Sequence, residues 1–165
     1  MERWGIDVAK EYFKFSSAHF LIFPDGTRER LHGHNYRVYV EVDAGLGEHG
    51  LVIDFKQIKP IVRDLVDSLD EYWLVPGEHQ VLRVEQRADG VTEVTYEGET
   101  WTAPTSDVVI LPINNTSSEN LAGWLGRELL AELGRQFPGV CPNRLKVAVE
   151  ETSGQRGIYE FVNED

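Results

Sequence analysis

Hydrophobic and polar residues alternate along two segments of the N-terminal third, and this alternation predicts two long strands. Between Asp7 and Leu21, the residues that share one face are Phe13, Phe15, Ser17 and His19. After a loop containing Pro24-Asp25-Gly26, the residues that share one face are Tyr36, Val38, Val40 and Val42. The two segments together predict a long antiparallel pair.

Two later segments carry apolar residues at helical spacing. The first follows Asp54, a favoured N-cap residue. Its apolar positions are Phe55, Ile58, Ile61, Val62, Leu65, Val66 and Leu69. The second begins near Ser118, where Thr116 and Glu119 fit the capping-box pattern, and ends at Gly134. Its apolar stripe is Leu121, Trp124, Leu125, Leu129 and Leu133.

Residues 77–112 have a different character, with short β-like runs separated by turn dipeptides, and predict an inserted hairpin or small extra sheet. The runs are Val81 to Glu85, Val91 to Tyr96 and Val108 to Leu111. Two closing strands are expected over 144–151 and 157–163. The order of elements is therefore ββαα with an insert, followed by ββ, which predicts a single α+β domain over residues 1–165.

The net charge of the chain limits the classes of partner that it can bind. A formal net charge of −12 excludes nucleic acid or an anionic membrane as the main partner, because both attract positively charged surfaces. The single cysteine, Cys141, cannot form an intramolecular disulfide. No apolar run has the length of a signal peptide core or a membrane span. We therefore expect a cytoplasmic protein.

His32-Gly33-His34 is the clearest candidate for chemistry. Residues two apart on a strand project from the same face, so both imidazoles share the face of Tyr36. His19 ends the preceding predicted strand, and pairing of the strands would bring it beside them. Three imidazoles with an open fourth position predict a catalytic Zn²⁺ site, although iron or another divalent ion suits the same ligands. The alternative is that H-x-H, a common pattern, binds no metal here.

A series of short motifs resembles the 6-pyruvoyl-tetrahydropterin synthase family. The motifs are Phe15-Ser16-Ser17-Ala18-His19, Leu31-His32-Gly33-His34-Asn35-Tyr36, Leu51-Val52-Ile53-Asp54-Phe55, Ser68-Leu69-Asp70, Ser118-Glu119-Asn120-Leu121-Ala122 and Val149-Glu150-Glu151-Thr152, with Tyr159 after them. Their order and spacing hold from about Phe13 to Tyr159 apart from the insert, and an ordered series is far more specific than any one motif.

The resemblance implies a tunnelling fold, in which an antiparallel four-stranded sheet carries two helices on one face. It also implies that three subunits close a β-barrel and that two trimers stack into a homohexamer with sites at subunit interfaces. The implied substrate is a pterin, usually 7,8-dihydroneopterin triphosphate, and the implied metal is zinc held by His19, His32 and His34.

Glu151 is the expected substrate anchor. It shares a strand face with Leu145, Val147 and Val149, so its carboxylate ends an apolar row. A pterin ring offers two adjacent N–H donors that one carboxylate can accept, and in the family the glutamate of this motif has that role. The alternative is that Glu151 emerges at the strand end into water. Ser117 and Ser118 fall where the family has small hydroxyl residues near the ring, and they also suit helix capping.

The catalytic groups depart from the usual family pattern at Arg28, where most members carry a cysteine. Glu29 lies three residues before His32, and the run 29–34 resembles a branch in which glutamate replaces that cysteine. The branch cleaves the substrate side chain to 6-hydroxymethyl-7,8-dihydropterin, a folate precursor. A carboxylate beside zinc can take a hydroxyl proton for such a retro-aldol cleavage. Glu29 can also be a solvated charge, and Arg28 and Arg30 can attract the triphosphate.

A second departure follows the first predicted helix. The family usually has Leu-Asp-His there, with aspartate and histidine relaying a proton. This chain reads Leu69-Asp70-Glu71, so Asp70 is retained and Glu71 replaces the histidine. Glu71 can act as acid or base if burial raises its pKa.

These features favour a zinc-dependent lyase that forms 6-hydroxymethyl-7,8-dihydropterin. Three alternatives remain. The chain can be a 6-pyruvoyl- or 6-carboxy-tetrahydropterin synthase. It can be a zinc- and pterin-binding protein without turnover. It can also be an assembly subunit in which the histidines staple a trimer, and that alternative predicts a fourth protein ligand on the metal.

Overall fold

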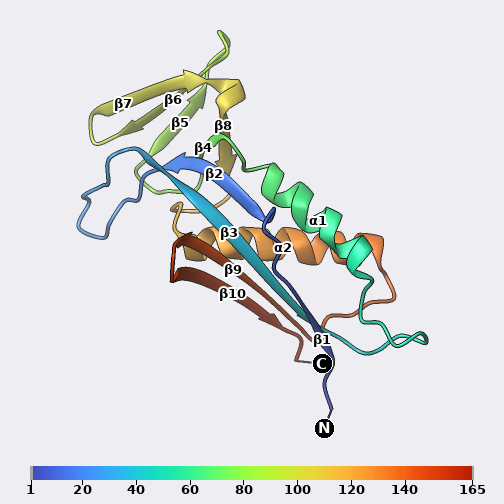
Figure 1. Cartoon of the computed structure of the whole chain (residues 1–165). Helices are drawn as coiled ribbons and strands as arrows, with labels where there is room; N and C mark the ends of the chain where they lie inside the picture. The colour runs from blue at the N-terminus through green and yellow to red at the C-terminus, as the bar shows by residue number, and fades with distance from the viewer. Residues whose placement is uncertain (1, 165) are drawn as a thin grey trace.

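The protein is built on a curled mixed sheet with two helices packed on one of its faces (Figure 1). The computed structural model describes residues 2–164. The sheet strands are β1 (Gly5–Val8), β2 (Lys14–His19), β3 (His32–Asp43), β4 (Tyr72–Pro76), β8 (Val108–Leu111), β9 (Arg144–Thr152) and β10 (Gln155–Val162). Their order is β10-β9-β3-β2-β4-β8, and β1 pairs with β3 beyond the end of β2.

The sheet is larger than the predicted four strands and is not wholly antiparallel. β4 and β8 extend it at one edge, with β4 parallel to β2 and β8 parallel to β4. The predicted strand 7–21 is divided, because Val8 pairs with Val40 whereas Lys14 pairs with Arg37. Five residues, 9–13, thus lie opposite two, Val38 and Tyr39. The extra residues turn out of the ladder at Lys10, whose carbonyl accepts from the Phe13 N–H (2.9 Å).

Both predicted helices are present, as α1 (Phe55–Asp67) and α2 (Ser118–Gln136). Asp54 caps α1 as expected, its carboxylate accepting from the Lys56 N–H at 2.8 Å. The capping of α2 differs from the predicted box. Ser117 is the N-cap and accepts from the Asn120 N–H, while Thr116 is buried before the helix. α2 packs on β9 and β10, and α1 packs on α2 and β2.

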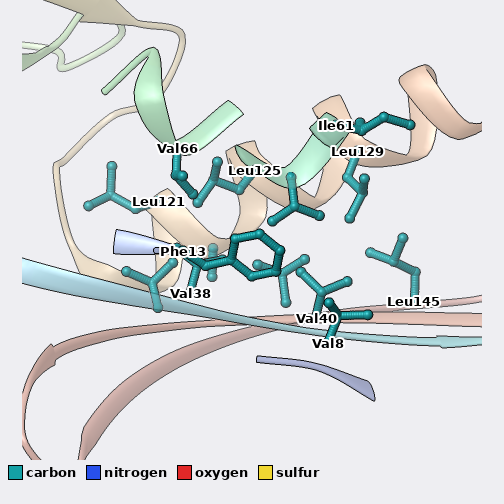
Figure 2. Packing of buried hydrophobic residues seen from close by; sticks show 14 of the residues in the cluster. Val8, Phe13, Val38, Val40, Ile61, Val66, Leu121, Leu125, Leu129 and Leu145 are labelled. Carbon is teal, nitrogen blue, oxygen red and sulfur yellow. The ribbon is translucent and has the colours of Figure 1, made fainter. Parts of the chain in front are cut away.

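The main core lies between the helices and the sheet (Figure 2). It joins side chains of β1, β2, β3 and β9 to the apolar faces of both helices. Among the labelled members are Val8, Phe13, Val38, Val40, Ile61, Val66, Leu121, Leu125, Leu129 and Leu145. Predicted strand parity and helix spacing therefore identified the buried faces, except at Phe55, the first residue of α1, which is exposed.

The predicted inserted hairpin is a three-stranded antiparallel meander of β5 (Arg83–Gln86), β6 (Val91–Tyr96) and β7 (Glu99–Pro104). A short 3₁₀ turn, Thr105–Asp107, leads from it into β8, so the run at 108–111 belongs to the main sheet. A second core fixes the meander to the sheet face opposite the helices. Its buried members are Phe20, Ile22, Trp73, Val75, Leu82, Val94, Tyr96 and Val108. Among the described residues, no helix has the length and apolar character needed to span a bilayer.

Candidate metal centre

Strand pairing brings the three predicted histidines together. His19 and His32 are direct cross-strand partners at the ends of β2 and β3, and Ser17 pairs with His34 one step further along. The Nε2 atoms of His32 and His34 lie 2.9 Å apart. One ring nitrogen from each histidine lies within 4.8 Å of the other two. Cross-strand neighbours and an i, i+2 pair thus place three imidazoles around one point.

Backbone carbonyls orient two of the imidazoles. His19 Nδ1 donates to the Thr116 carbonyl at 2.9 Å, and His32 Nδ1 donates to the Arg30 carbonyl at 2.6 Å. A ring whose Nδ1 carries the proton presents Nε2 as a free ligand, which is the usual arrangement around metal-binding histidines. His19 is fully buried, and this burial lowers its pKa and favours the neutral imidazole. The donor set therefore fits a divalent metal of the zinc type.

Glu151 lies beside this centre. Its Oε1 is 3.5 Å from His34 Nε2, and its Oε2 is 4.0 Å from His19 Nε2. The Ser118 hydroxyl donates to Oε2 at 3.3 Å. The approach of α2 to the sheet depends on Gly157 of β10, where an added Cβ would lie 2.2 Å from the Glu119 backbone nitrogen. The start of α2 thus lies close enough to the end of β9 for Ser118 to bond to the Glu151 carboxylate.

Glu29 lies beside His32, in the loop between β2 and β3. Its Oε2 is 3.9 Å from His32 Nε2 and accepts from the Leu21 N–H at 3.0 Å. The Glu29 N–H in turn donates to the Leu21 carbonyl at 2.9 Å. Both side chains near the centre stay accessible, with Glu29 31% and Glu151 22% exposed.

The two arginines of this loop have different surroundings. Arg28 forms an ion pair with Glu99 of β7, and its guanidinium carbon lies 4.6 Å from the centre of the Trp101 ring. Arg30 is exposed, and its carbonyl accepts from His32. Ser117 caps α2, whereas Ser118 contacts Glu151.

Asp70 and Glu71 are not brought to the imidazoles of their own chain. Asp70 Oδ1 accepts from the Ser16 N–H at 2.7 Å, and the Glu71 N–H donates to the Ser16 carbonyl at 2.7 Å. The Ser16 hydroxyl donates to the Asn35 side chain at 2.6 Å. Ser16 and Asn35 have the opposite strand parity to the three histidines, and Asp70 and Glu71 line one surface pocket together with them. This group therefore belongs to the other side of the sheet.

Sequence reasoning missed two residues that contact the ligands. Tyr36 is fully buried, and its hydroxyl lies within 3.3 Å of both ring nitrogens of His19. Burial and the nearby carboxylates of Glu151 and Glu29 raise its pKa. Thr116 supplies the carbonyl that orients His19. The parity of Tyr36 with His34 was a usable signal, but nothing in the sequence pointed to Thr116.

The alternative in which the histidines only hold a trimer together requires a fourth protein ligand on the metal. Within residues 2–164, the His, Cys, Asp and Glu side chains that come together as a metal-ligating group are the three histidines, with no carboxylate among them. Two acids lie beside that group, Glu29 next to His32 and Glu151 next to His34 and His19.

Known proteins with similar sequences and structures define the family. The family model described as 6-pyruvoyl tetrahydropterin synthase matches residues 7–161. A putative 6-carboxy-5,6,7,8-tetrahydropterin synthase of Methanocaldococcus jannaschii is 35% identical over 150 residues, which cover 88% of each chain. A protein of the same description from Pyrococcus abyssi is 30% identical and covers 73% of this chain and 72% of its own.

Solved structures of similar proteins point to the same family. The crystal structure of 6-pyruvoyl tetrahydropterin synthase from Plasmodium vivax has a TM-score of 0.90 and 28% identity, covering 99% of this chain and 100% of that chain. A variant of the same enzyme, described as a catalytic residue mutant with alanine in place of glutamate, matches equally well, with a TM-score of 0.90. The resemblance inferred from the ordered motifs is therefore confirmed, and so is the α+β fold with two helices on a curled sheet.

Proposed function

The chain belongs to the 6-pyruvoyl tetrahydropterin synthase family, and from this premise we propose that it is a zinc-dependent lyase that cleaves the side chain of 7,8-dihydroneopterin triphosphate to give 6-hydroxymethyl-7,8-dihydropterin. The single observation that carries the proposal is the position of Glu29, whose carboxylate lies 3.9 Å from a nitrogen of the three-histidine group. A carboxylate in that place stands where a general base for a nearby substrate hydroxyl is needed.

His19, His32 and His34 are the residues that would hold the zinc ion. Two of them donate Nδ1–H to backbone carbonyls, so their Nε2 atoms are free to bind. A bound zinc ion supplies Lewis acidity, which makes hydroxyl groups of the substrate side chain more acidic.

Glu29 then accepts the proton of a side-chain hydroxyl. As that oxygen becomes a carbonyl, the carbon–carbon bond beside it breaks, and the carbon that stays on the pterin takes up a proton. The products are 6-hydroxymethyl-7,8-dihydropterin and a triphosphate-bearing aldehyde, so atoms and electrons balance without an oxidant. The glutamate described as catalytic in the Plasmodium vivax enzyme supports this role.

Glu151 and Ser118 are the proposed pterin anchor. The Glu151 carboxylate accepts the two adjacent N–H groups of the ring, and the Ser118 hydroxyl, 3.3 Å from Oε2, holds the carboxylate in place. Arg30 is exposed and remains our candidate for the triphosphate. Ser117 contributes by capping the helix that carries Ser118.

Asp70 and Glu71 fit a site that is completed by a neighbouring subunit. Within one chain they lie on the side of the sheet away from the imidazoles, beside Ser16. The proposed homohexamer, a dimer of trimers, would place them against the centre of another copy. There they would serve as the proton relay that returns a proton to the pterin carbon.

Product identification tests the proposal. Zinc-loaded protein is incubated with 7,8-dihydroneopterin triphosphate, and the products are identified by mass spectrometry, with Glu29→Ala alongside. We expect 6-hydroxymethyl-7,8-dihydropterin from the wild type and none from the variant. Unchanged substrate that still binds would instead favour the zinc- and pterin-binding protein without turnover.

A second candidate is 6-carboxy-tetrahydropterin synthesis. It is favoured by the 35% identity to the Methanocaldococcus jannaschii protein of that description. The same experiment separates the two, because a carboxylate product differs in mass and charge from a hydroxymethyl product.

A further inference from the structure

The meander lies against the loop that joins β2 to β3, and this loop carries Glu29 (Figure 1). Two contacts bridge them besides Arg28. The Trp101 ring of β7 packs on Phe20 with centroids 5.0 Å apart, and Phe20 directly follows the ligand His19. The Tyr96 hydroxyl of β6 donates to the Gly26 carbonyl at 2.8 Å. The meander therefore contacts the loop at its start and near its middle.

Arg28 is the most direct link between the meander and the candidate base. Its Nε donates to Glu99 Oε2 at 2.6 Å, and its guanidinium lies over the Trp101 ring. Its Nη1 donates to the carbonyl of Glu29 at 2.8 Å. The side chain is only 20% exposed. One planar guanidinium thus connects two residues of β7 to the backbone of the residue that faces the imidazoles.

The charge of this arrangement suits a positioning role. Arg28 is neutralised by Glu99, and it bonds to the carbonyl of Glu29 and not to its carboxylate. A bond from Arg28 to the carboxylate would instead occupy the group that must accept the substrate proton. The carboxylate of Glu29 is held separately, by the Leu21 N–H at 3.0 Å.

We propose that Arg28, clamped by Glu99 and Trp101, is a positioning residue that fixes Glu29 at the three-histidine centre, and that the meander serves as the support for this clamp. The inference rests on the proposed function of Glu29 and replaces our sequence-based expectation that Arg28 binds the triphosphate. A guanidinium engaged on both of its edges has little left to offer a phosphate.

Steady-state kinetics of Arg28→Ala, Glu99→Gln and Trp101→Leu test this clamp. Small displacements of a catalytic group cost large factors in rate, so we expect kcat to fall about tenfold or more in Arg28→Ala, with smaller falls in the other two and KM within about twofold. Zinc content should not change. Arg87→Ala is the matched control, because Arg87 pairs with Asp89 (2.6 Å) and Glu93 (3.6 Å) in the same meander without a bond to the loop.

Amide hydrogen exchange gives a readout that does not depend on turnover. The Leu21 N–H donates to the Glu29 carboxylate, and the Glu29 N–H donates to the Leu21 carbonyl. The protection of both amides against exchange should fall in all three clamp variants and stay intact in Arg87→Ala. Glu99→Gln and Trp101→Leu weaken the clamp but keep Arg28. They therefore still test the proposal if Arg28→Ala does not fold.

Two outcomes separate the possible failures. A rise in KM for the triphosphate with unchanged kcat and unchanged protection at Leu21 would overturn the clamp and return Arg28 to phosphate binding. Full activity of Glu29→Ala would defeat the proposed function instead, while loss of protection in the clamp variants would still report the support of the loop.

Discussion

At the residue scale, the sequence predicted the side chains that the structure brings together, but it did not predict the groups that hydrogen-bond to them. Strand parity placed His32 and His34 on one face, and the pairing register of the structure, with His19 opposite His32, brings His19 beside them. Glu151 follows from its place after an apolar row. Thr116 could not be predicted, because its contact with His19 is made by a carbonyl, and every residue type has one.

Glu151 carries the first prediction at this scale. Replacement of its carboxylate by an amide in Glu151→Gln removes the negative charge and turns one of the two acceptor atoms into a donor. Hydrogen bonds to charged groups contribute about 1.5–3 kcal/mol. We expect pterin affinity, measured by quenching of pterin fluorescence, to fall about tenfold or more with zinc content unchanged. Glu150→Gln is the control, since Glu150 is on the other face and pairs with Arg156. Equal losses in both variants would contradict the anchor.

The buried imidazole of His19 predicts a pH dependence of stability in the metal-free protein. Burial lowers its pKa below the ordinary 6.5 of a histidine, so below that pH the unfolded chain binds a proton that the folded protein binds less readily. The free energy of unfolding, measured with urea, should therefore fall as the pH drops from roughly 7.5 to 5.5, the range in which an ordinary histidine becomes protonated. His19→Gln should flatten this slope, and an unchanged slope in that variant would contradict the role of its burial.

At the element scale, amphipathic helices and alternating strands were predicted well, and strands buried on both faces were not. Tyr72–Pro76 is an unbroken apolar run without alternation, as parallel strands often are, and so gave no period-two signal. The meander was recognised only as an insert, since β7 has an exposed and mixed sequence. Asp70 and Glu71 follow α1 as expected, but their side of the sheet depends on the unpredicted pairing of β4 with β2.

Gly157 carries the prediction at this scale. A Cβ there would overlap the first turn of α2, so Gly157→Ala must move the helix away from β10. Overpacking of this kind costs about 1–3 kcal/mol, and we expect urea unfolding to show such a loss together with weaker pterin binding through Ser118. Gly134→Ala, in α2 with open space at its Cβ, should lose no stability. Unchanged stability of Gly157→Ala would contradict the packing described.

At the scale of the whole molecule, the position of Asp70 predicts that sites are shared between subunits. Glu29→Ala and Asp70→Asn should each be inactive alone. Mixed in equal amounts and allowed to reassemble, they should recover about a quarter of the wild-type activity, because that share of sites pairs an intact Glu29 with an intact Asp70 of a neighbour. Native mass spectrometry would establish the assembly. Absence of recovery in mixed hexamers would place both residues in one chain's site.

The most direct test of the account is the reaction carried out in D₂O by zinc-loaded wild-type protein and by Glu29→Gln, which keeps the shape of the side chain and removes the base. The account predicts that wild type converts 7,8-dihydroneopterin triphosphate to 6-hydroxymethyl-7,8-dihydropterin with one non-exchangeable deuterium on the hydroxymethyl carbon, and that Glu29→Gln forms none. A carboxylated product, or undiminished turnover by Glu29→Gln, would contradict it.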